Sequence, residues 1–216
     1  PRRPDYAAQA VQAKKKSVKP ATALAVDFAN WAGNLTPEVI TAWKVAGVKR
    51  VIVRASTERQ ALSDIARQQM AVCAEAGFEL EAYLWLYWFR DLSPVVQVEQ
   101  ALTVCSGYPV KRLWLDCEDA TVLEPAEIVA RIGEAVIACE EAGMPVGCYT
   151  RRAWWQQWTA DSREFAHLPL WDCELGDPEL GGFVSYGGWS KQAMRQYEFD
   201  VPLAGGPMVD LNVYAL

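Results

Sequence analysis

The chain has 216 residues, of which 51% are hydrophobic and 22% charged, as in a globular protein with a sizeable core. Its formal charge of −6 is unevenly spread, because residues 1–19 carry six Lys or Arg and one acid, which leaves −11 on the remaining residues. An acidic body argues against nucleic-acid binding, and the lack of any apolar run of 18 residues argues against a membrane span.

The basic residues form the first element in chain order. We expect residues 1–21 to be a basic N-terminal arm or linker, followed by one domain over residues 22–216. The first four residues, Pro-Arg-Arg-Pro, begin no apolar stretch, so no secretory signal is predicted. A solvated, flexible tail is the simplest interpretation, and contact with an anionic surface or a partner is the alternative.

Up to residue 150, short apolar runs alternate with amphipathic segments, which is the pattern of repeated βα units. The apolar runs predict strands at Ala23–Ala29, Val48–Ala55, Phe78–Trp88, Arg112–Glu118 and Pro145–Thr150. The amphipathic segments predict a helix opened by the cap Thr36-Pro37-Glu38 and further helices at Glu58–Ala76, Pro94–Cys105, Pro125–Ala142 and near Arg151–Thr159. Gly77 and Gly143 are expected to end two of these helices.

The pattern changes after residue 160. Strands are expected at Leu168–Leu175, Ala193–Phe199 and Met208–Tyr214, with loops rather than long helices between them. The fold class is therefore α/β, a single TIM-like β/α barrel with a parallel sheet and with reduced helices in the last third. A doubly wound open sheet is the alternative, although the sequence has no glycine-rich nucleotide-binding motif.

Acidic residues follow the predicted strands at the end where barrel enzymes hold their catalytic groups. Asp27 closes the first strand, Asp116 and Glu118 close the fourth, and Asp210 lies in the last. Side chains alternate along a strand, so Asp116 and Glu118 should face one side with Cα atoms about 6.6 Å apart. Clustered buried carboxyls force their pKa values apart, and paired carboxyls are the machinery of glycoside hydrolysis.

Other uses of these acids stay open. Any one of them taken alone is more simply a helix cap or a salt-bridge partner. Six cysteines without a CxxC pair and a single histidine make a zinc site improbable, whereas a magnesium site stays an alternative. The cysteines lie in apolar stretches and are predicted to be buried free thiols from a reducing compartment.

Several segments together resemble glycoside hydrolase family 25, the lysozymes of Chalaropsis type that are common as phage endolysins. The resemblance runs from about Ala23 to Tyr214, in the order Ala25-Val26-Asp27, Leu113-Trp114-Leu115-Asp116-Cys117-Glu118, Gly147-Cys148-Tyr149-Thr150, Leu168-Pro169-Leu170-Trp171, Gln196-Tyr197 and Val209-Asp210-Leu211-Asn212. The Asp-x-Glu of the fourth strand and the late Val-Asp-x-Asn are its specific parts.

The resemblance implies a peptidoglycan hydrolase without a cofactor. It implies cleavage of the β-1,4 bond between N-acetylmuramic acid and N-acetylglucosamine, with Glu118 as general acid/base. Asp116 would be its partner, orienting the substrate acetamido group or stabilising the positive intermediate, and Asp27 and Asp210 would complete an acidic floor. The implied partner is bacterial cell-wall peptidoglycan, with further domains or virion proteins reached through the arm.

Aromatic side chains near the strand ends are candidates for stacking on sugar rings. The predicted substrate-binding residues are Trp31, Tyr83, Trp85, Tyr149, Trp171 and Gln196, although core packing is the alternative for any single ring. The chain departs from the family at Tyr83-Leu84-Trp85, where Tyr-His-Phe is usual. It departs again after Trp171, where Asp172 and Glu174 add acids.

Two further functions remain open. One is a non-catalytic glycan-binding or virion structural barrel of the same family, and the other is a hydrolase of another polysaccharide. We expect the protein to be made in a reducing cytoplasm without a signal peptide and to act on the bacterial cell wall, as a phage endolysin or a virion-associated enzyme.

Overall fold

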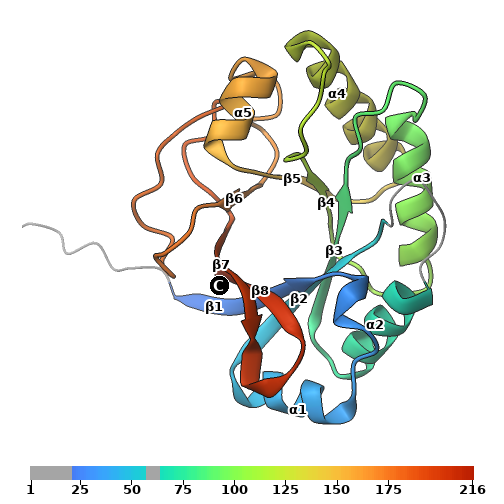
Figure 1. Cartoon of the computed structure of the whole chain (residues 1–216), viewed down its shortest axis with the longest axis vertical. Helices are drawn as coiled ribbons and strands as arrows, with labels where there is room; N and C mark the ends of the chain where they lie inside the picture. The colour runs from blue at the N-terminus through green and yellow to red at the C-terminus, as the bar shows by residue number, and fades with distance from the viewer. Residues whose placement is uncertain (1–20, 57–63) are drawn as a thin grey trace, which may run out of the picture.

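A computed structural model describes residues 21–56 and 64–216, which form a closed barrel of eight strands with helices outside it (Figure 1). The strands neighbour one another in chain order, so the predicted α/β barrel is confirmed and the open sheet is excluded. The strands are β1 Thr22–Phe28, β2 Val48–Arg54, β3 Glu79–Trp85, β4 Leu113–Asp116, β5 Val146–Thr150, β6 Leu170–Cys173, β7 Met194–Pro202 and β8 Met208–Ala215.

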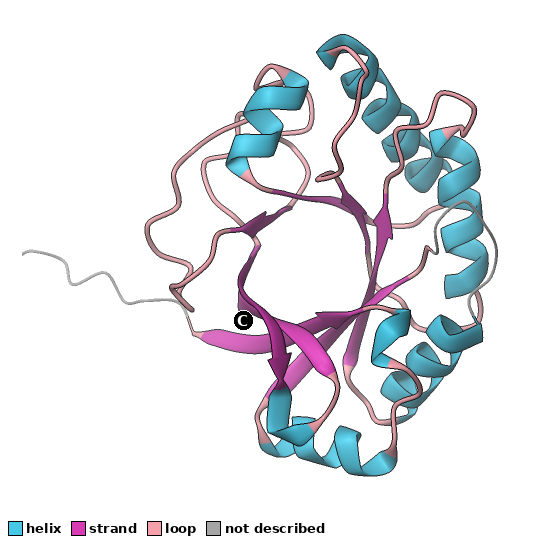
Figure 2. Ribbon diagram, viewed as in Figure 1, coloured by secondary structure: helices cyan, strands magenta, loops and turns pink. Residues whose placement is uncertain are grey.

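The helices cover the barrel unevenly (Figure 2). They are α1 Pro37–Val45, α2 Asp64–Glu75, α3 Pro94–Cys105, α4 Pro125–Glu141 and α5 Arg152–Thr159, with short 3-10 turns η1 Asn30–Ala32 and η2 Leu203–Gly205. The expected start of the second helix and the basic arm, apart from Ala21, lie outside the described residues. No described helix is long and apolar enough to cross a bilayer.

Local sequence signals explain where the helices begin and end. Thr36 accepts a hydrogen bond from the Val39 amide at 3.4 Å, and Pro37 opens α1, as the cap predicts. Gly77 and Gly143 follow α2 and α4 with φ of 78° and 69°, a backbone conformation that side chains with a Cβ disfavour.

The last strand corrects the expectation of a parallel sheet. Strands β1 to β7 pair in parallel, but β8 runs antiparallel to both β7 and β1. The connection from β7 to β8 contains only residues 203–207, which is far too short for the crossover that a parallel pair needs. In the β1–β8 pair Thr22 faces Ala215 at one end and Asp27 faces Asp210 at the other.

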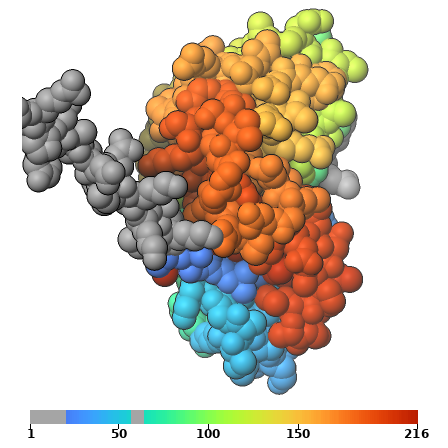
Figure 3. Space-filling model, turned by 90° about the vertical axis from the view of Figure 1, so that its left-hand side faces the viewer, coloured from blue at the N-terminus to red at the C-terminus, as the bar shows by residue number. Residues whose placement is uncertain are grey.

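The last third has loops where the earlier part has helices, as predicted. Figure 3 shows this side of the molecule, whose surface is formed largely by the segments after β5. Aromatic packing replaces the missing helices, because Trp155 contacts Trp189 and Phe165 at ring-centroid distances of 4.8 and 6.0 Å. Trp189 in turn packs on Tyr186 at 5.6 Å.

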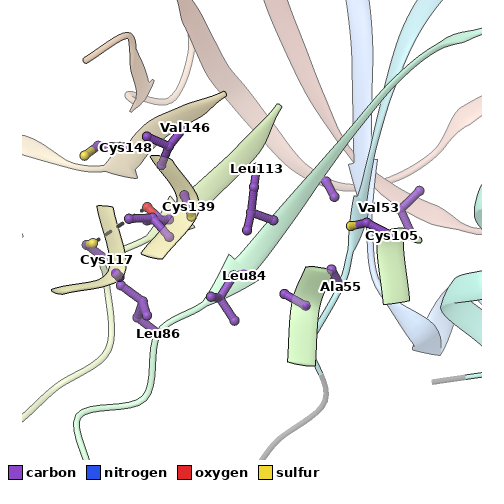
Figure 4. Packing of buried hydrophobic residues seen from close by; sticks show 14 of the residues in the cluster. Val53, Ala55, Leu84, Leu86, Cys105, Leu113, Cys117, Cys139, Val146 and Cys148 are labelled. Carbon is purple, nitrogen blue, oxygen red and sulfur yellow. Dashed lines mark hydrogen bonds between the residues drawn. The ribbon is translucent and has the colours of Figure 1, made fainter. Parts of the chain in front are cut away.

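Two separate apolar layers hold the barrel. The larger lies between the strands and the helices, and Figure 4 shows part of it, with Cys105, Cys117, Cys139 and Cys148 among aliphatic side chains. All six cysteines are unpaired, as predicted; five are buried and Cys173 is partly exposed.

The smaller layer fills the inside of the barrel with aromatic rings. Trp171 contacts Tyr149, Trp114 and Tyr83 edge-to-face, with centroids 4.5, 5.7 and 6.3 Å apart. Below these rings the buried Glu81 accepts a 2.6 Å hydrogen bond from Trp114 and pairs with Arg50 at 3.5 Å. The barrel is thus packed solid at the amino-terminal ends of the strands, and its free space lies at the opposite end.

Candidate active site

A pocket of about 210 Å³ opens at the carboxyl ends of the parallel strands. It brings together all ten residues that the sequence predicts for the site, with Arg151 and Phe199 in addition. The lining residues are Asp27, Trp31, Tyr83, Trp85, Asp116, Glu118, Tyr149, Arg151, Trp171, Gln196, Phe199 and Asp210. We call this space the acid pocket; the roles of its residues stay predictions.

Asp27 and Asp210 lie side by side although one ends its strand and the other begins its strand. The reversal of β8 places its start beside the end of β1, where the two acids pair in register. The Gln196 side-chain amide bridges them, donating to Asp27 Oδ1 at 2.9 Å and to Asp210 Oδ2 at 3.0 Å. Tyr149 donates its hydroxyl to the Gln196 carbonyl, which fixes the orientation of that amide.

Asn212 is a further support of the acid floor that sequence reasoning missed. Its fully buried side chain donates to Asp27 Oδ1 at 2.7 Å and accepts from the Trp171 indole N–H at 2.7 Å. Asn212 therefore ties the aromatic layer to the acid above it. Its place two residues after Asp210, on the same face of the strand, is a signal that could have identified it.

Asp116 and Glu118 reach the acid pocket differently from the prediction. Strand β4 ends at Asp116, so Glu118 lies in the following loop rather than on the strand. Cys117 holds that loop in place, because its amide donates to the Tyr149 carbonyl at 2.9 Å and its carbonyl accepts from Thr150 Oγ1 at 2.7 Å. Both carboxyl groups still line one pocket.

One oxygen of Asp116 is buried without a hydrogen-bond partner in the described part of the chain. Asp116 is 4% exposed, and its Oδ1 atom has no hydrogen-bond partner among the described residues. A buried acceptor left unpaired is costly unless another molecule supplies the donor. Because Asp116 also lines the acid pocket, its carboxyl group is a candidate acceptor for an N–H group of a bound molecule.

Burial raises the pKa of all four acids above its ordinary value. For Asp27 the nearby Asp210 adds to the effect of burial, and for Asp116 the nearby Glu118 does so. Burial also raises the pKa of Glu118, while the positive charge of Arg151 opposes that shift. Burial likewise raises the pKa of Asp210. Acids so close together cannot all ionise, so the cluster can supply both a proton donor and a carboxylate.

Two arginines at the site were also missed by sequence reasoning. Arg54, at the end of β2, donates to the Tyr87 hydroxyl at 3.0 Å and lies 5.1 Å from the Trp85 ring centroid. Its positive charge opposes the rise that burial causes in the pKa of Asp116. Arg151 follows β5 and is exposed at the rim of the pocket. Both stand at carboxyl ends of strands, so the barrel rule could have found them.

The predicted sugar-stacking residues fall into two groups. Trp31, on η1, is 66% exposed, and Trp85 is half-buried, so both can present a ring to a ligand. Tyr83, Tyr149 and Trp171 are at most 6% exposed and belong to the aromatic layer under the acids. These three shape the floor of the pocket more than they offer a stacking face.

The described residues include no group of three or more His, Cys, Asp or Glu side chains placed to hold a metal ion. Side-chain amides support two of the four acids, because Gln196 donates to Asp27 and Asp210 and Asn212 donates to Asp27. The chemistry that the arrangement can perform is proton transfer and the stabilisation of positive charge by carboxylates.

Comparisons with known proteins agree on one family. The family model described as Lysozyme-like protein 1 matches residues 18–197. The probable GH family 25 lysozyme 2 of Dictyostelium discoideum is 27% identical over 186 residues, which are 83% of this chain and 86% of that protein.

Solved structures share the fold. The muramidase from Acremonium alcalophilum superposes with a TM-score of 0.74 at 22% identity, covering 90% of this chain and 94% of its own. The family GH25 lysozyme from Aspergillus fumigatus does so with a TM-score of 0.77 at 18% identity, covering 91% and 95%. At such low identity these two matches concern the fold alone.

Proposed function

The chain belongs to the lysozyme-like glycoside hydrolases of family 25, and from that premise we propose that it is a muramidase of bacterial peptidoglycan. Its bond is the β-1,4 linkage from N-acetylmuramic acid to N-acetylglucosamine. The observation that carries the proposal is the placement of Asp116 and Glu118 in one pocket, among acids whose burial raises their pKa.

In the proposed reaction Glu118 is the general acid. Burial raises the pKa of Glu118 and so favours its protonated form, and that proton passes to the glycosidic oxygen as the bond to the anomeric carbon breaks. The carbonyl oxygen of the substrate acetamido group bonds to the anomeric carbon as the leaving sugar departs. The Asp116 carboxyl group accepts the acetamido N–H and stabilises the positive charge that develops.

The second half of the reaction returns the proton. Glu118, now a carboxylate, takes a proton from water as that water attacks the anomeric carbon and the bond to the acetamido oxygen breaks. Two displacements on one carbon retain the β configuration. Asp27 and Asp210 keep the floor of the pocket acidic and are held by Gln196.

Glu118→Gln tests the central role, because an amide cannot donate the proton. We expect wall-degrading activity to fall by about 10²–10⁴ with the fold intact. The matched control is Glu140→Gln on the exposed surface of α4, which should retain full activity. Activity of Glu118→Gln within tenfold of the unaltered protein would overturn the assignment.

Product analysis tests the bond and the stereochemistry. New reducing ends should lie on N-acetylmuramic acid, identified by mass spectrometry after borohydride reduction, and the first anomer seen by proton NMR should be β. Ends on N-acetylglucosamine would indicate a glucosaminidase. Tight binding to cell walls without any turnover would favour the non-catalytic barrel instead.

We also propose that the protein is made in a reducing compartment and acts on the bacterial wall as an endolysin or virion-associated enzyme. All six unpaired cysteines support the first part, since proteins of oxidising compartments commonly pair their cysteines.

A further inference from the structure

A second pocket, of about 290 Å³, lies next to the acid pocket. It is formed where β5 and β6 end and α5 begins, three elements that neighbour one another in the barrel (Figure 1). Arg151 lines both pockets. We call this space the arginine pocket, after Arg151 and Arg152.

The charges of the arginine pocket do not cancel. Of its two acids, Asp172 is buried and accepts a 2.7 Å hydrogen bond from the Tyr186 hydroxyl. Burial raises the pKa of Asp172, which favours the neutral form of this carboxyl. The other acid, Glu174, lies 3.6 Å from Arg195.

The two arginines, in contrast, form no direct ion pair with any described residue, although Arg151 is near enough to Glu118 to oppose the rise in the pKa of that acid. In the part of the chain that the structure describes, neither the Arg151 nor the Arg152 guanidinium forms a hydrogen bond or an ion pair, although Arg152 is near enough to lower the pKa of Asp172. The first turn of α5 begins here without a side-chain cap, which adds partial positive charge. With Arg195 at Glu174, three arginines stand against two acids here, so this pocket carries a net positive charge beside a pocket of four acids.

We propose that the arginine pocket binds a carboxylate of the peptide attached to the sugar that occupies the acid pocket. A guanidinium matches a carboxylate with two parallel hydrogen bonds, and Leu175 and Val184 offer an apolar wall to short aliphatic residues. The inference rests on the proposed muramidase function, because the attached peptide reaches the arginine pocket when its muramic acid occupies the acid pocket. The arginine pocket would select substrates that carry a peptide carboxylate. The acid pocket cannot do so, because its carboxylates repel anions.

Binding of small fragments tests this without relying on turnover. The probes are N-acetylmuramyl-L-alanyl-D-isoglutamine, which carries one carboxylate, and its neutral carboxamide, both titrated calorimetrically into the unaltered protein. We expect the acid to bind on the order of tenfold more tightly than the amide, with a preference that declines as salt is added.

Variants connect that preference to the arginine pocket. Arg152→Gln, at a residue that lines the arginine pocket alone, should weaken binding of the acid on the order of tenfold and leave binding of the amide unchanged. Lys49→Gln removes one exposed positive charge at the start of β2 and serves as the charge-matched control without effect.

Equal affinity for acid and amide, or no measurable binding of the acid, would overturn the inference. If cell walls are still cleaved in that case, the muramidase proposal stands alone. If walls are not cleaved while the acid binds through Arg152, the arginine pocket stands and the muramidase proposal fails.

Discussion

Replacing Asn212 by Asp probes the support of the acid floor most directly. The substitution keeps the shape of the side chain and its acceptor for the Trp171 indole, but it turns a 2.7 Å donor to Asp27 into a second carboxyl. At a position with no exposed surface, two carboxyls in contact cannot both ionise. The folded variant must therefore hold a proton that the unfolded chain releases.

The magnitude follows from the pH of the measurement. An unfolded Asp has a pKa of about 3.9, so holding its proton at pH 7 costs about 3 pH units, or about 4 kcal/mol of the free energy of unfolding. The folded pKa is raised, so this penalty is absent below about pH 4 and grows as the pH rises. At pH 4 only the lost N–H donor remains, which costs about 0.5–1.5 kcal/mol.

Urea unfolding followed by tryptophan fluorescence, at pH 4 and pH 7, measures both values against the unaltered protein. Asn212→Leu is the control, because it removes the donor to Asp27 and the acceptor for Trp171 without adding a carboxyl. Its loss of stability should increase less between pH 4 and pH 7 than that of Asn212→Asp. A loss for Asn212→Asp that is equal at the two pH values, or smaller at pH 7, would refute the account of Asp27.

Three more outcomes are expected. Activity should fall on the alkaline side of the pH profile as Glu118 loses its proton, at a pH above the ordinary range of a Glu pKa. Arg151→Gln should move this alkaline limb of the profile to higher pH, because Arg151 lowers the pKa of Glu118. An unmoved alkaline limb would contradict the electrostatic role of Arg151. A thiol reagent should count six free cysteines after unfolding without reductant, and two or fewer would indicate disulfides. Gly147→Ala should lower the free energy of unfolding by about 1–3 kcal/mol and lower the Tm, because the added Cβ would lie 2.5 Å from the Trp114 ring. The control Gly133→Ala, where the added Cβ meets open space, should stabilise α4. Equal effects of the two substitutions on stability would count against the close packing at Gly147.

Much of the barrel could be predicted because each strand and helix carries its own local signal. The apolar runs and the caps are properties of neighbouring residues, so the order of elements, the start of α1 and the bounds of α4 followed from sequence. The direction of β8 could not be read in that way, since it depends on which strand it pairs with. The short connection between Pro202 and Met208 was the one feature of the sequence that indicated an antiparallel β8.

The residues of the site also differ in whether the sequence alone could identify them. Asp27, Asp116, Glu118 and Asp210 stand out because acids in apolar strands are expensive to bury. Asn212 and the two arginines were missed, because an amide or a cation near a strand end becomes informative only once its partners are known. Likewise the end of β4 at Asp116 reflects contacts of Cys117 with β5, which is distant in sequence.

The antiparallel seam between β1 and β8 has a mechanical consequence. The backbone enters the barrel at Ala21 and leaves it at Leu216, and these two residues are joined by a 2.9 Å hydrogen bond at the pole away from the acids. A force that pulls them apart loads the rungs of the β1–β8 ladder one after another, as in a zipper, instead of shearing them together. The Asp27–Asp210 pair is the last rung, so under such a force the end of the seam that carries the acid pocket separates last.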